Sequence, residues 1–351
     1  METLFRPGLL KQKDFRFIWE LQRYFFKFVL FLAFVSQVIE VVIYPEIRLT
    51  ISILVPVILE MSAFLSVFRF RQKIHQLLKK VSDCSRALGL IEEKQKFRIS
   101  IIIYCSIMMI LTACYLLLHF NSKKRAFMIN MMIKSSFFSF QLQEYLSIFL
   151  DVNVSVVIIT QSLVLISLSG YYGFVCFYLR FLLRKLEQYA RNASGDRYQH
   201  IIHTYLKIIH TVKFLEDYLC FSAFATVVSS MSGLFYANYS LLFASIGDLQ
   251  HFLALLSGEI FFSTFIVMII VPASAVNDAL LSTKKALIFL TRIRPQHFNE
   301  VTLIISSEEV SLTLWKIYKI RKSLIISALG TLLSYGILVA TLDTMKNPRV
   351  I

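Results

Sequence analysis

Four carboxylates stand within long apolar stretches of the sequence: Glu40, Glu60, Asp151 and Glu259. A charged side chain at membrane depth is costly, so it usually pairs with another group or marks a path for ions or ligands. Glu259 lies about 8 residues into its stretch, a depth of roughly 12 Å at ~1.5 Å per residue. It can contact a polar ligand or pair with a neighbouring helix, whereas Glu60 suits a structural pair better.

Residues with the chemistry of enzymes or metal sites form no recognisable constellation. His200 and His203 lie three residues apart and His210 follows them, but a metal site needs further ligands. The five cysteines have irregular spacings without a C-x-x-C pair, which indicates small buried side chains rather than a disulfide or metal framework. Because the sequence also lacks the motifs of intramembrane proteases, we predict a protein without enzymatic activity, metal or cofactor.

Small and hydroxyl residues are concentrated in the last apolar segment, 323–342, which reads SLIISALGTLLSYGILVATL. Small residues let membrane helices approach closely, and a polar stripe can alternatively line a water-filled path. Positions 334, 338, 341, 342 and 345 recur at helical spacing and can share one face. Composition alone leaves both interpretations open.

Membrane-spanning helices must position these residues. The chain of 351 residues is 57% hydrophobic and 17% charged, against about 45–50% and about 25% in soluble domains. A spanning helix needs about 20 mostly apolar residues. Seven segments qualify: 24–44, 51–68, 99–119, 145–179, 218–243, 252–274 and 323–342. We therefore expect an all-α membrane protein with one domain over residues 1–351.

Lysine and arginine are distributed unevenly among the connections between these segments. The N-terminal segment and the loops 69–98, 180–217 and 275–322 carry 29 of them, whereas the other connections and the C-terminal end carry seven. Cytoplasmic loops are enriched in these residues, so the N-terminus is predicted in the cytoplasm and the C-terminus outside. The net charge of +15 then needs no nucleic acid as a partner.

The basic loops are themselves helix-like. Segment 71–90 places Ile74, Leu77, Leu78 and Val81 at three- and four-residue spacing, which is typical of a helix face. Segments 184–217 and 308–322 continue in the same style. We expect the helices to extend into the cytoplasm as a packed bundle, and helices lying on anionic lipid are the alternative.

Two other membrane classes fit less well. G-protein-coupled receptors also have seven helices, but their N-terminus lies outside, and their D-R-Y-like and N-P-x-x-Y motifs are missing. Secondary transporters usually have two related halves with Gly- or Pro-interrupted helices at corresponding positions. Seven segments do not divide equally and the breaks do not pair, although a small-molecule transporter remains the alternative hypothesis.

The last segment resembles a family motif. Arthropod gustatory receptors and their odorant-receptor relatives carry Thr-Tyr, five hydrophobic residues and Gln-Phe in their last helix. Here Ser334-Tyr335 precedes residues 336–340 and then Thr341-Leu342. Chain layout, predicted topology and basic inner loops resemble that family over the whole chain, whereas the motif covers only the last helix.

The resemblance implies a gustatory-type chemosensory receptor in the plasma membrane. Such a protein is a ligand-gated, non-selective cation channel of four subunits, either identical or combined with related receptors. It implies a tastant pocket that opens outward among helices 24–274, a pore helix at 323–346, and intersubunit contacts made by the cytoplasmic segments 180–217 and 275–322.

By motif position, the pore residues implied by the resemblance are Ser334, Tyr335, Leu338, Thr341 and Leu342. Leu338 and Leu342 would form the hydrophobic constriction, and packing against neighbouring helices is the alternative role for this set. Thr341 and Leu342 stand where Gln and Phe are usual. That departure leaves conduction open and makes a non-conducting scaffold of the same superfamily a third hypothesis.

Candidate residues for the outward pocket are polar or aromatic: Tyr115, His119, Gln161, Tyr171, Tyr236 and Glu259. Each is a weak candidate, because the chain has 32 Phe and 16 Tyr and aromatic residues line most pockets. Two N-x-S/T sequons, at Asn153 and Asn238, fall near the predicted outer surface. Both lie close to the bilayer, which disfavours glycosylation.

Overall fold

The computed structural model describes residues 71–90, 94–121, 140–192, 198–242, 249–293 and 310–327, together with single positions at 28, 31, 35, 58, 59, 62, 63, 65, 330, 331 and 334. The chain forms two compact units. One comprises residues 1–54 and 126–162, and the other comprises residues 55–125 and 163–351. In the first unit the described part is the beginning of one long helix and three helical positions, Phe28, Phe31 and Val35.

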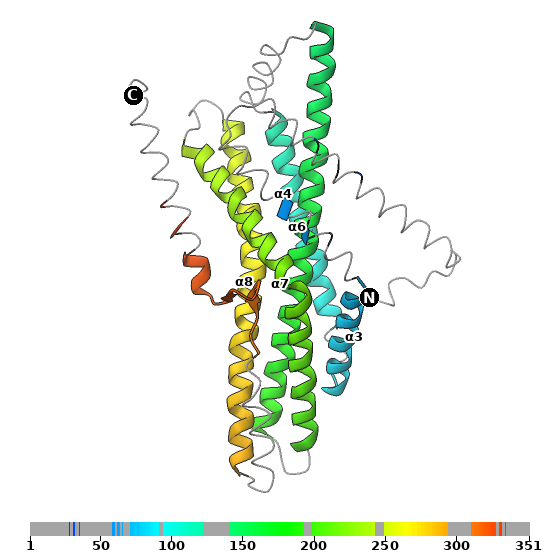
Figure 1. Ribbon diagram of the computed structural model, residues 1–351, viewed down its shortest axis with the longest axis vertical. Helices are drawn as coiled ribbons and strands as arrows, with labels where there is room; N and C mark the ends of the chain where they lie inside the picture. Colours follow the sequence, from blue (N-terminus) through cyan, green and yellow to red (C-terminus); the bar gives the residue numbers. More distant parts are fainter. Residues whose placement is uncertain are drawn as a thin grey trace, which may run out of the picture. The chain divides into compact units, whose positions relative to one another are not determined.

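Five helices account for most of the described residues (Figure 1). They are α3 (Arg71–Ala87), α4 (Lys94–Asn121), α6 (Phe140–Arg191), α7 (Tyr198–Leu242) and α8 (Leu249–Ile293). The last four are long and apolar enough to cross a membrane, and they coincide with four of the seven predicted spans. The predicted spans 24–44, 51–68 and 323–342 lie largely outside the described residues, and their described positions are helical.

Helices α6, α7 and α8 are longer than a bilayer requires. They contain 52, 45 and 45 residues. At ~1.5 Å per residue these lengths correspond to roughly 78 and 68 Å, against about 30 Å of hydrocarbon. Each helix therefore has a part that projects beyond the membrane, as the sequence predicted. The side of the membrane on which these parts lie remains a prediction.

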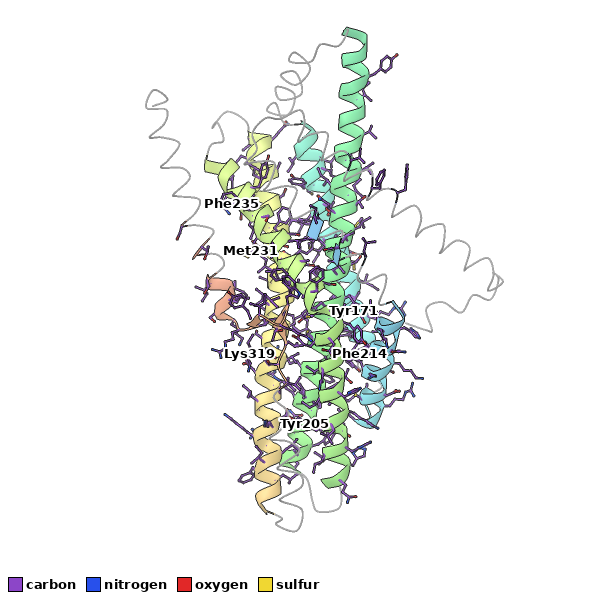
Figure 2. All side chains as sticks on the ribbon, viewed as in Figure 1. Tyr171, Tyr205, Phe214, Met231, Phe235 and Lys319 are labelled. Atoms are coloured by element: carbon purple, nitrogen blue, oxygen red, sulfur yellow. The ribbon has the colours of Figure 1, made fainter. Side chains whose placement is uncertain are left out.

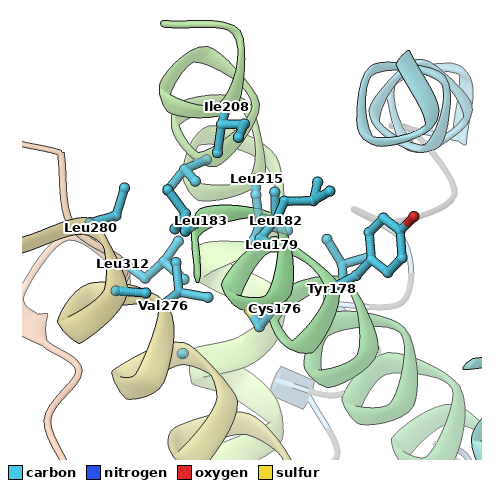
Figure 3. Packing of buried hydrophobic residues seen from close by; sticks show 14 of the residues in the cluster. Cys176, Tyr178, Leu179, Leu182, Leu183, Ile208, Leu215, Val276, Leu280 and Leu312 are labelled. Atoms are coloured by element: carbon cyan, nitrogen blue, oxygen red, sulfur yellow. The ribbon is translucent and has the colours of Figure 1, made fainter. Parts of the chain in front are cut away.

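The three long helices pack against one another. Leu179, Leu182, Leu183 and Leu186 of α6 recur at three- and four-residue spacing and are at most 1% exposed. They meet a seam from α7 and α8 that includes Ile208, Leu215, Val276 and Leu280 (Figure 3). Helices lying singly on lipid would not bury such a seam within the protein. These helices therefore form a packed bundle, and its position in the cytoplasm stays a prediction.

Helix α3 covers one side of this bundle. Leu77 and Val81 are buried, and Lys80 Nζ lies 4.4 Å from the ring centroid of Phe214 on α7. Figure 2 shows Phe214 at this contact. By contrast, Ile102, Ile110 and Leu117 of α4 are more than half exposed. An apolar face without a protein partner is what a lipid-facing helix presents.

Residues 308–322 do not form the expected helix. In the described part of this segment, β1 (Thr313–Leu314) pairs antiparallel with β2 (Tyr318–Lys319). The backbone of Trp315 and Lys316 has φ of 50° and 58°, and the Ile317 N–H donates to the Leu314 carbonyl at 3.0 Å. Positive φ at both central residues is the geometry of a type I′ turn, which no α-helix can accommodate.

Helices α6 and α8 approach closely at Gly173. A Cβ at this position would overlap the carbonyl oxygen of Met268 in α8 and lie 3.0 Å from two atoms of the Met268 side chain. Pro272 stands four residues after Met268 within α8. Proline has no N–H to give to the carbonyl four residues earlier, and its ring pushes that carbonyl outward. Gly173 leaves room for the displaced oxygen.

Candidate functional site

Three predicted ligand residues come together where α4, α7 and α8 meet. The Tyr115 ring of α4 lies against Gly258 of α8, where a Cβ would be 3.6 Å from Tyr115 Cε2. The hydroxyl groups of Tyr115 and Tyr236 are close enough to interact electrostatically. Glu259 follows Gly258 directly. The outer-site cluster is defined here as Tyr115, Tyr236, Asn238 and Glu259.

Glu259 is the only acidic member of this cluster. The side chain of Asn238 lies beside the Glu259 carboxylate, and Asn238 Nδ2 donates a hydrogen bond to the Leu234 carbonyl at 2.9 Å. The carboxylate oxygen Oε1 of Glu259 is shielded from solvent and meets no donor among the described residues. An unsatisfied buried acceptor costs about 1–3 kcal/mol. The site therefore has one acceptor available for a donor from elsewhere.

Asn238 was predicted as a sequon close to the bilayer. Its side-chain amide is half-buried and engaged with Leu234 and Glu259. Whether this sequon is glycosylated stays a prediction. The side chain of Asn153 lies outside the described residues.

Aromatic and aliphatic side chains pack immediately after Glu259 along α8. Phe261 and Phe265 stack edge to face at 4.6 Å between ring centroids. They form a small buried cluster with Met108 of α4 and with Leu165 and Ile166 of α6. This apolar packing separates the outer-site cluster from the main core and fixes the spacing of α4 and α8. Met231 and Phe235 occupy the stretch of α7 that leads to Tyr236 (Figure 2).

The remaining ligand candidates lie elsewhere or outside the described side chains. The Tyr171 hydroxyl donates to the Ile74 carbonyl of α3 at 3.4 Å, so this residue faces α3 rather than the outer-site cluster (Figure 2). Gln161 is half-buried on α6 in the first unit. His119 has helical backbone, but its side chain is outside the description.

One of the five predicted pore residues is described. Ser334 is helical and exposed, and its hydroxyl donates to the Gly330 carbonyl at 2.9 Å. Thr331 donates in the same way to Ser327 at 2.8 Å, so both hydroxyls are satisfied by their own helix. Tyr335, Leu338, Thr341 and Leu342 lie outside the described residues, and their pore role stays a prediction.

Sequence reasoning missed a second polar site, on the hairpin. Asn277 of α8 is 6% exposed, and Glu216 of α7 is 8% exposed. Asn277 Nδ2 donates to the carbonyls of Leu312 and Ile320 at 3.1 and 3.0 Å, and its Oδ1 accepts from the Leu312 N–H at 2.7 Å. An amide side chain in the middle of an apolar helix could have pointed to this contact, since a buried polar group needs partners.

Glu216 holds the neighbouring hairpin residue. Its carboxylate accepts from the Thr313 N–H at 3.0 Å and also from the Thr313 hydroxyl. At the turn, Lys316 Nζ donates to Asp217 Oδ1 at 3.1 Å, and this bond raises the pKa of Lys316. The hairpin clasp is defined here as Glu216 and Asn277 with hairpin residues 312–320.

Comparison with solved structures gives a match over nearly the whole chain. The olfactory receptor OR5 of the insect Machilis hrabei covers 95% of this chain, with 92% of its own length aligned, a TM-score of 0.68 and 13% sequence identity. This chain has the fold of an insect olfactory receptor. The same receptor in complex with eugenol aligns with a TM-score of 0.67 and 13% identity, over 96% of this chain and 92% of the receptor.

The likeness lies in the fold rather than in the sequence. No protein-family model matches the chain, and no curated protein matches it in sequence. The shared fold and the four apolar helices describe a multi-pass membrane protein. Membership of the gustatory subfamily and the number of subunits stay predictions.

Proposed function

We propose that this protein is a chemosensory receptor of the gustatory type that acts as a ligand-gated, non-selective cation channel of the plasma membrane. A small molecule binds in an outward-facing pocket among helices 24–274 and opens a pore lined by the last helix, 323–346. Four identical or related subunits surround the pore. The observation that carries the proposal is the fold match to an olfactory receptor over 95% of the chain, combined with the Ser334-Tyr335 motif.

The outer-site cluster supplies the ligand contacts in this proposal. Tyr115 and Tyr236 offer aromatic faces and hydroxyl groups, and Glu259 offers an oxygen that lacks a donor among the described residues. A ligand with a hydroxyl or ammonium donor satisfies that oxygen, and an ammonium group also interacts favourably with tyrosine faces. The olfactory receptor of known structure was captured with eugenol, which carries a phenolic hydroxyl.

Whole-cell current is the direct test. Cells that express the chain are exposed to eugenol, sucrose, caffeine and denatonium, with surface expression measured in parallel. The proposal expects an inward cation current for at least one compound and a tetramer in detergent. No current for any compound, together with a monomeric particle, would overturn it.

Glu259→Gln tests the ligand site within the same assay. A hydrogen bond to a charged group contributes about 1.5–3 kcal/mol, so we expect the half-maximal concentration to rise roughly tenfold to a hundredfold. Asp83→Asn is the matched control, because Asp83 is an exposed carboxylate of α3 that pairs with Arg86 at 3.7 Å. Equal responses of the two variants would refute the role of Glu259.

A non-conducting scaffold of the same superfamily is the second candidate function. The specific observation in its favour is Thr341-Leu342 at the positions where Gln-Phe is usual. It predicts tetramers at the cell surface that bind a compound without current. A small-molecule transporter would instead show uptake of a labelled compound without subunit assembly.

A further inference from the structure

The hairpin clasp stands directly before the last helix. Residue 320 closes the hairpin, and the helical backbone begins at Ser323. Figure 1 shows the hairpin against α7 and α8. Arg321 and Lys322 join the hairpin to the last helix, so a movement of α7 and α8 that the hairpin follows is passed along the chain to that helix. Lys322 Nζ also lies 3.8 Å from Asp278 Oδ2 of α8, and Leu324 and Ile325 pack against the main core.

Asn277 ties both strands of the hairpin to α8 with one side chain. Both of its carbonyl acceptors, Leu312 and Ile320, also belong to the closing pair of the hairpin, since the Ile320 N–H donates to the Leu312 carbonyl at 3.1 Å. The amide group thereby extends the hydrogen-bond ladder of the hairpin into α8. Leu312 and Ile320 are fully buried beside it.

Helix α7 holds the same hairpin independently. The Glu216 carboxylate accepts hydrogen bonds from the N–H and the hydroxyl of Thr313. The centroid of the Trp315 ring lies 5.7 Å from that of Phe221 and 5.0 Å from that of Phe224. Trp315 keeps a positive φ of 50°, which is unfavourable for a bulky residue. The packing of Trp315 on α7 offsets this strain. The hairpin therefore has a defined conformation and is not a flexible linker.

The two helices that hold the hairpin also carry the outer-site cluster. Glu259 precedes Asn277 by 18 residues on α8, and Tyr236 follows Glu216 by 20 residues on α7. At ~1.5 Å per residue the separations are roughly 27 and 30 Å. Each helix is continuous over that distance, although the α8 stretch contains Pro272, so Glu216 and Asn277 each share one helix with ligand residues.

We infer that Asn277 and Glu216 are positioning residues that transmit ligand-driven displacement of α7 and α8 to the last helix. The inference rests on the proposed channel function. When the outer-site cluster closes on a ligand, α7 and α8 move and carry the hairpin with them, and the hairpin pulls the beginning of the last helix. Loosening the hairpin clasp weakens the coupling but leaves the ligand site and the pore unaltered.

The test compares three variants at matched surface expression. Asn277→Leu keeps the branched shape of the side chain and removes all three bonds to the hairpin. Thr313→Val removes the hydroxyl that donates to Glu216 and serves as a second variant if the first does not reach the surface. Ser274→Ala is the matched control, because Ser274 is buried on the same helix and its hydroxyl donates only within α8, to Val271 at 2.9 Å.

Patch-clamp recordings measure the half-maximal concentration, the maximal open probability and the single-channel conductance for eugenol and for the panel compound with the largest wild-type current. For Asn277→Leu and Thr313→Val we expect a half-maximal concentration about tenfold higher and a lower maximal open probability. The single-channel conductance should stay at the wild-type value. Ser274→Ala should match the wild type in all three quantities.

Hydrogen exchange of the purified chain separates the possible failures. Peptides that contain Leu312 and Thr313 should exchange about tenfold faster in Asn277→Leu, because the protecting acceptor is gone. Faster exchange with unchanged concentration–response curves would overturn the inference while the channel function stands. The absence of current in the wild type would instead overturn the proposed function, and the coupling role would fall with it.

Discussion

Gly173→Ala adds one methyl group where α6 closely approaches α8. The new Cβ would overlap the Met268 carbonyl oxygen and lie 3.0 Å from Cε and Cγ of the Met268 side chain. The thioether side chain can change rotamer, but the backbone oxygen cannot move unless α8 shifts. The variant therefore forces the two helices apart at the point where the bundle begins.

Two opposing contributions set the size of this effect. Overpacking of a well-packed contact destabilises a protein by about 1–3 kcal/mol. Alanine is favoured over glycine within a helix by about 0.5–1 kcal/mol. Since the obstacle is backbone rather than side chain, the upper part of the first range applies, and the net loss should be about 1–2 kcal/mol.

Pro272 makes the explanation specific. Pro272→Ala restores an N–H for the Met268 carbonyl and removes the ring that crowds it, so the oxygen can turn back into α8. In that background Gly173→Ala should lose less stability, with a coupling of at least about 0.5 kcal/mol between the two sites. Helix propensity acts on each site separately, so it does not produce this coupling free energy between Gly173→Ala and Pro272→Ala.

The assay is the apparent melting temperature of the detergent-solubilised chain, read as loss of the monodisperse chromatography peak. We expect Gly173→Ala to melt roughly 1–3 °C lower than the wild type. Gly258→Ala is the control, because its Cβ would lie 3.6 Å from the nearest atom of Tyr115, an ordinary contact. A Gly173→Ala protein as stable as the control refutes the packing argument, and an equal loss with Pro272→Ala refutes the proline explanation.

Three further predictions concern single residues. Leu342→Ala should raise the basal current if this side chain closes the pore, and an unchanged leak counts against that role. Tyr171→Phe should leave concentration–response curves within about twofold of the wild type, because its hydroxyl meets the Ile74 carbonyl rather than the outer-site cluster; a large shift would return Tyr171 to the ligand site. Burial raises the pKa of the Cys84 thiol, so less thiolate is present at neutral pH and maleimide should label it more slowly than it labels a small-molecule thiol. Its labelling rate should rise with pH and after denaturation; rapid labelling of the native protein at neutral pH would contradict its burial.

The long helices could be predicted from the sequence because their apolar length and residue spacing are strong signals. Apolar segments of about 20 residues and the three- to four-residue spacing of Ile74, Leu77 and Val81 predict helices that cross a bilayer and continue beyond it. The structure has α3, α4, α6, α7 and α8 over those residues. The excess of basic residues in alternate connections predicts the orientation of the chain in the membrane, which stays a prediction.

The hairpin and the outer-site cluster were harder to predict for different reasons. Leu312, Leu314 and Ile320 alternate with polar neighbours, but a strand of two residues is too short for a period of two to stand out from a helical spacing. The grouping of Tyr115 with Tyr236 and Glu259 depends on how α4, α7 and α8 pack, and no spacing within one segment encodes that. Tyr171 illustrates the same point, since its helix face turns to α3.

Because α7 and α8 are long, a small rotation at one end of either helix produces a larger displacement at the other end. A tilt of about 2° at Glu259 moves a point roughly 27 Å further along the helix by about 1 Å. The bond from the Leu312 N–H to Asn277 is 2.7 Å long, and a stretch of that size takes it out of hydrogen-bonding range. The hairpin must then either travel with the helix or detach from it. A gradual change of helix tilt at the Glu259 end therefore leads to one of two discrete states at the Asn277 end, in which the hairpin is either attached or detached.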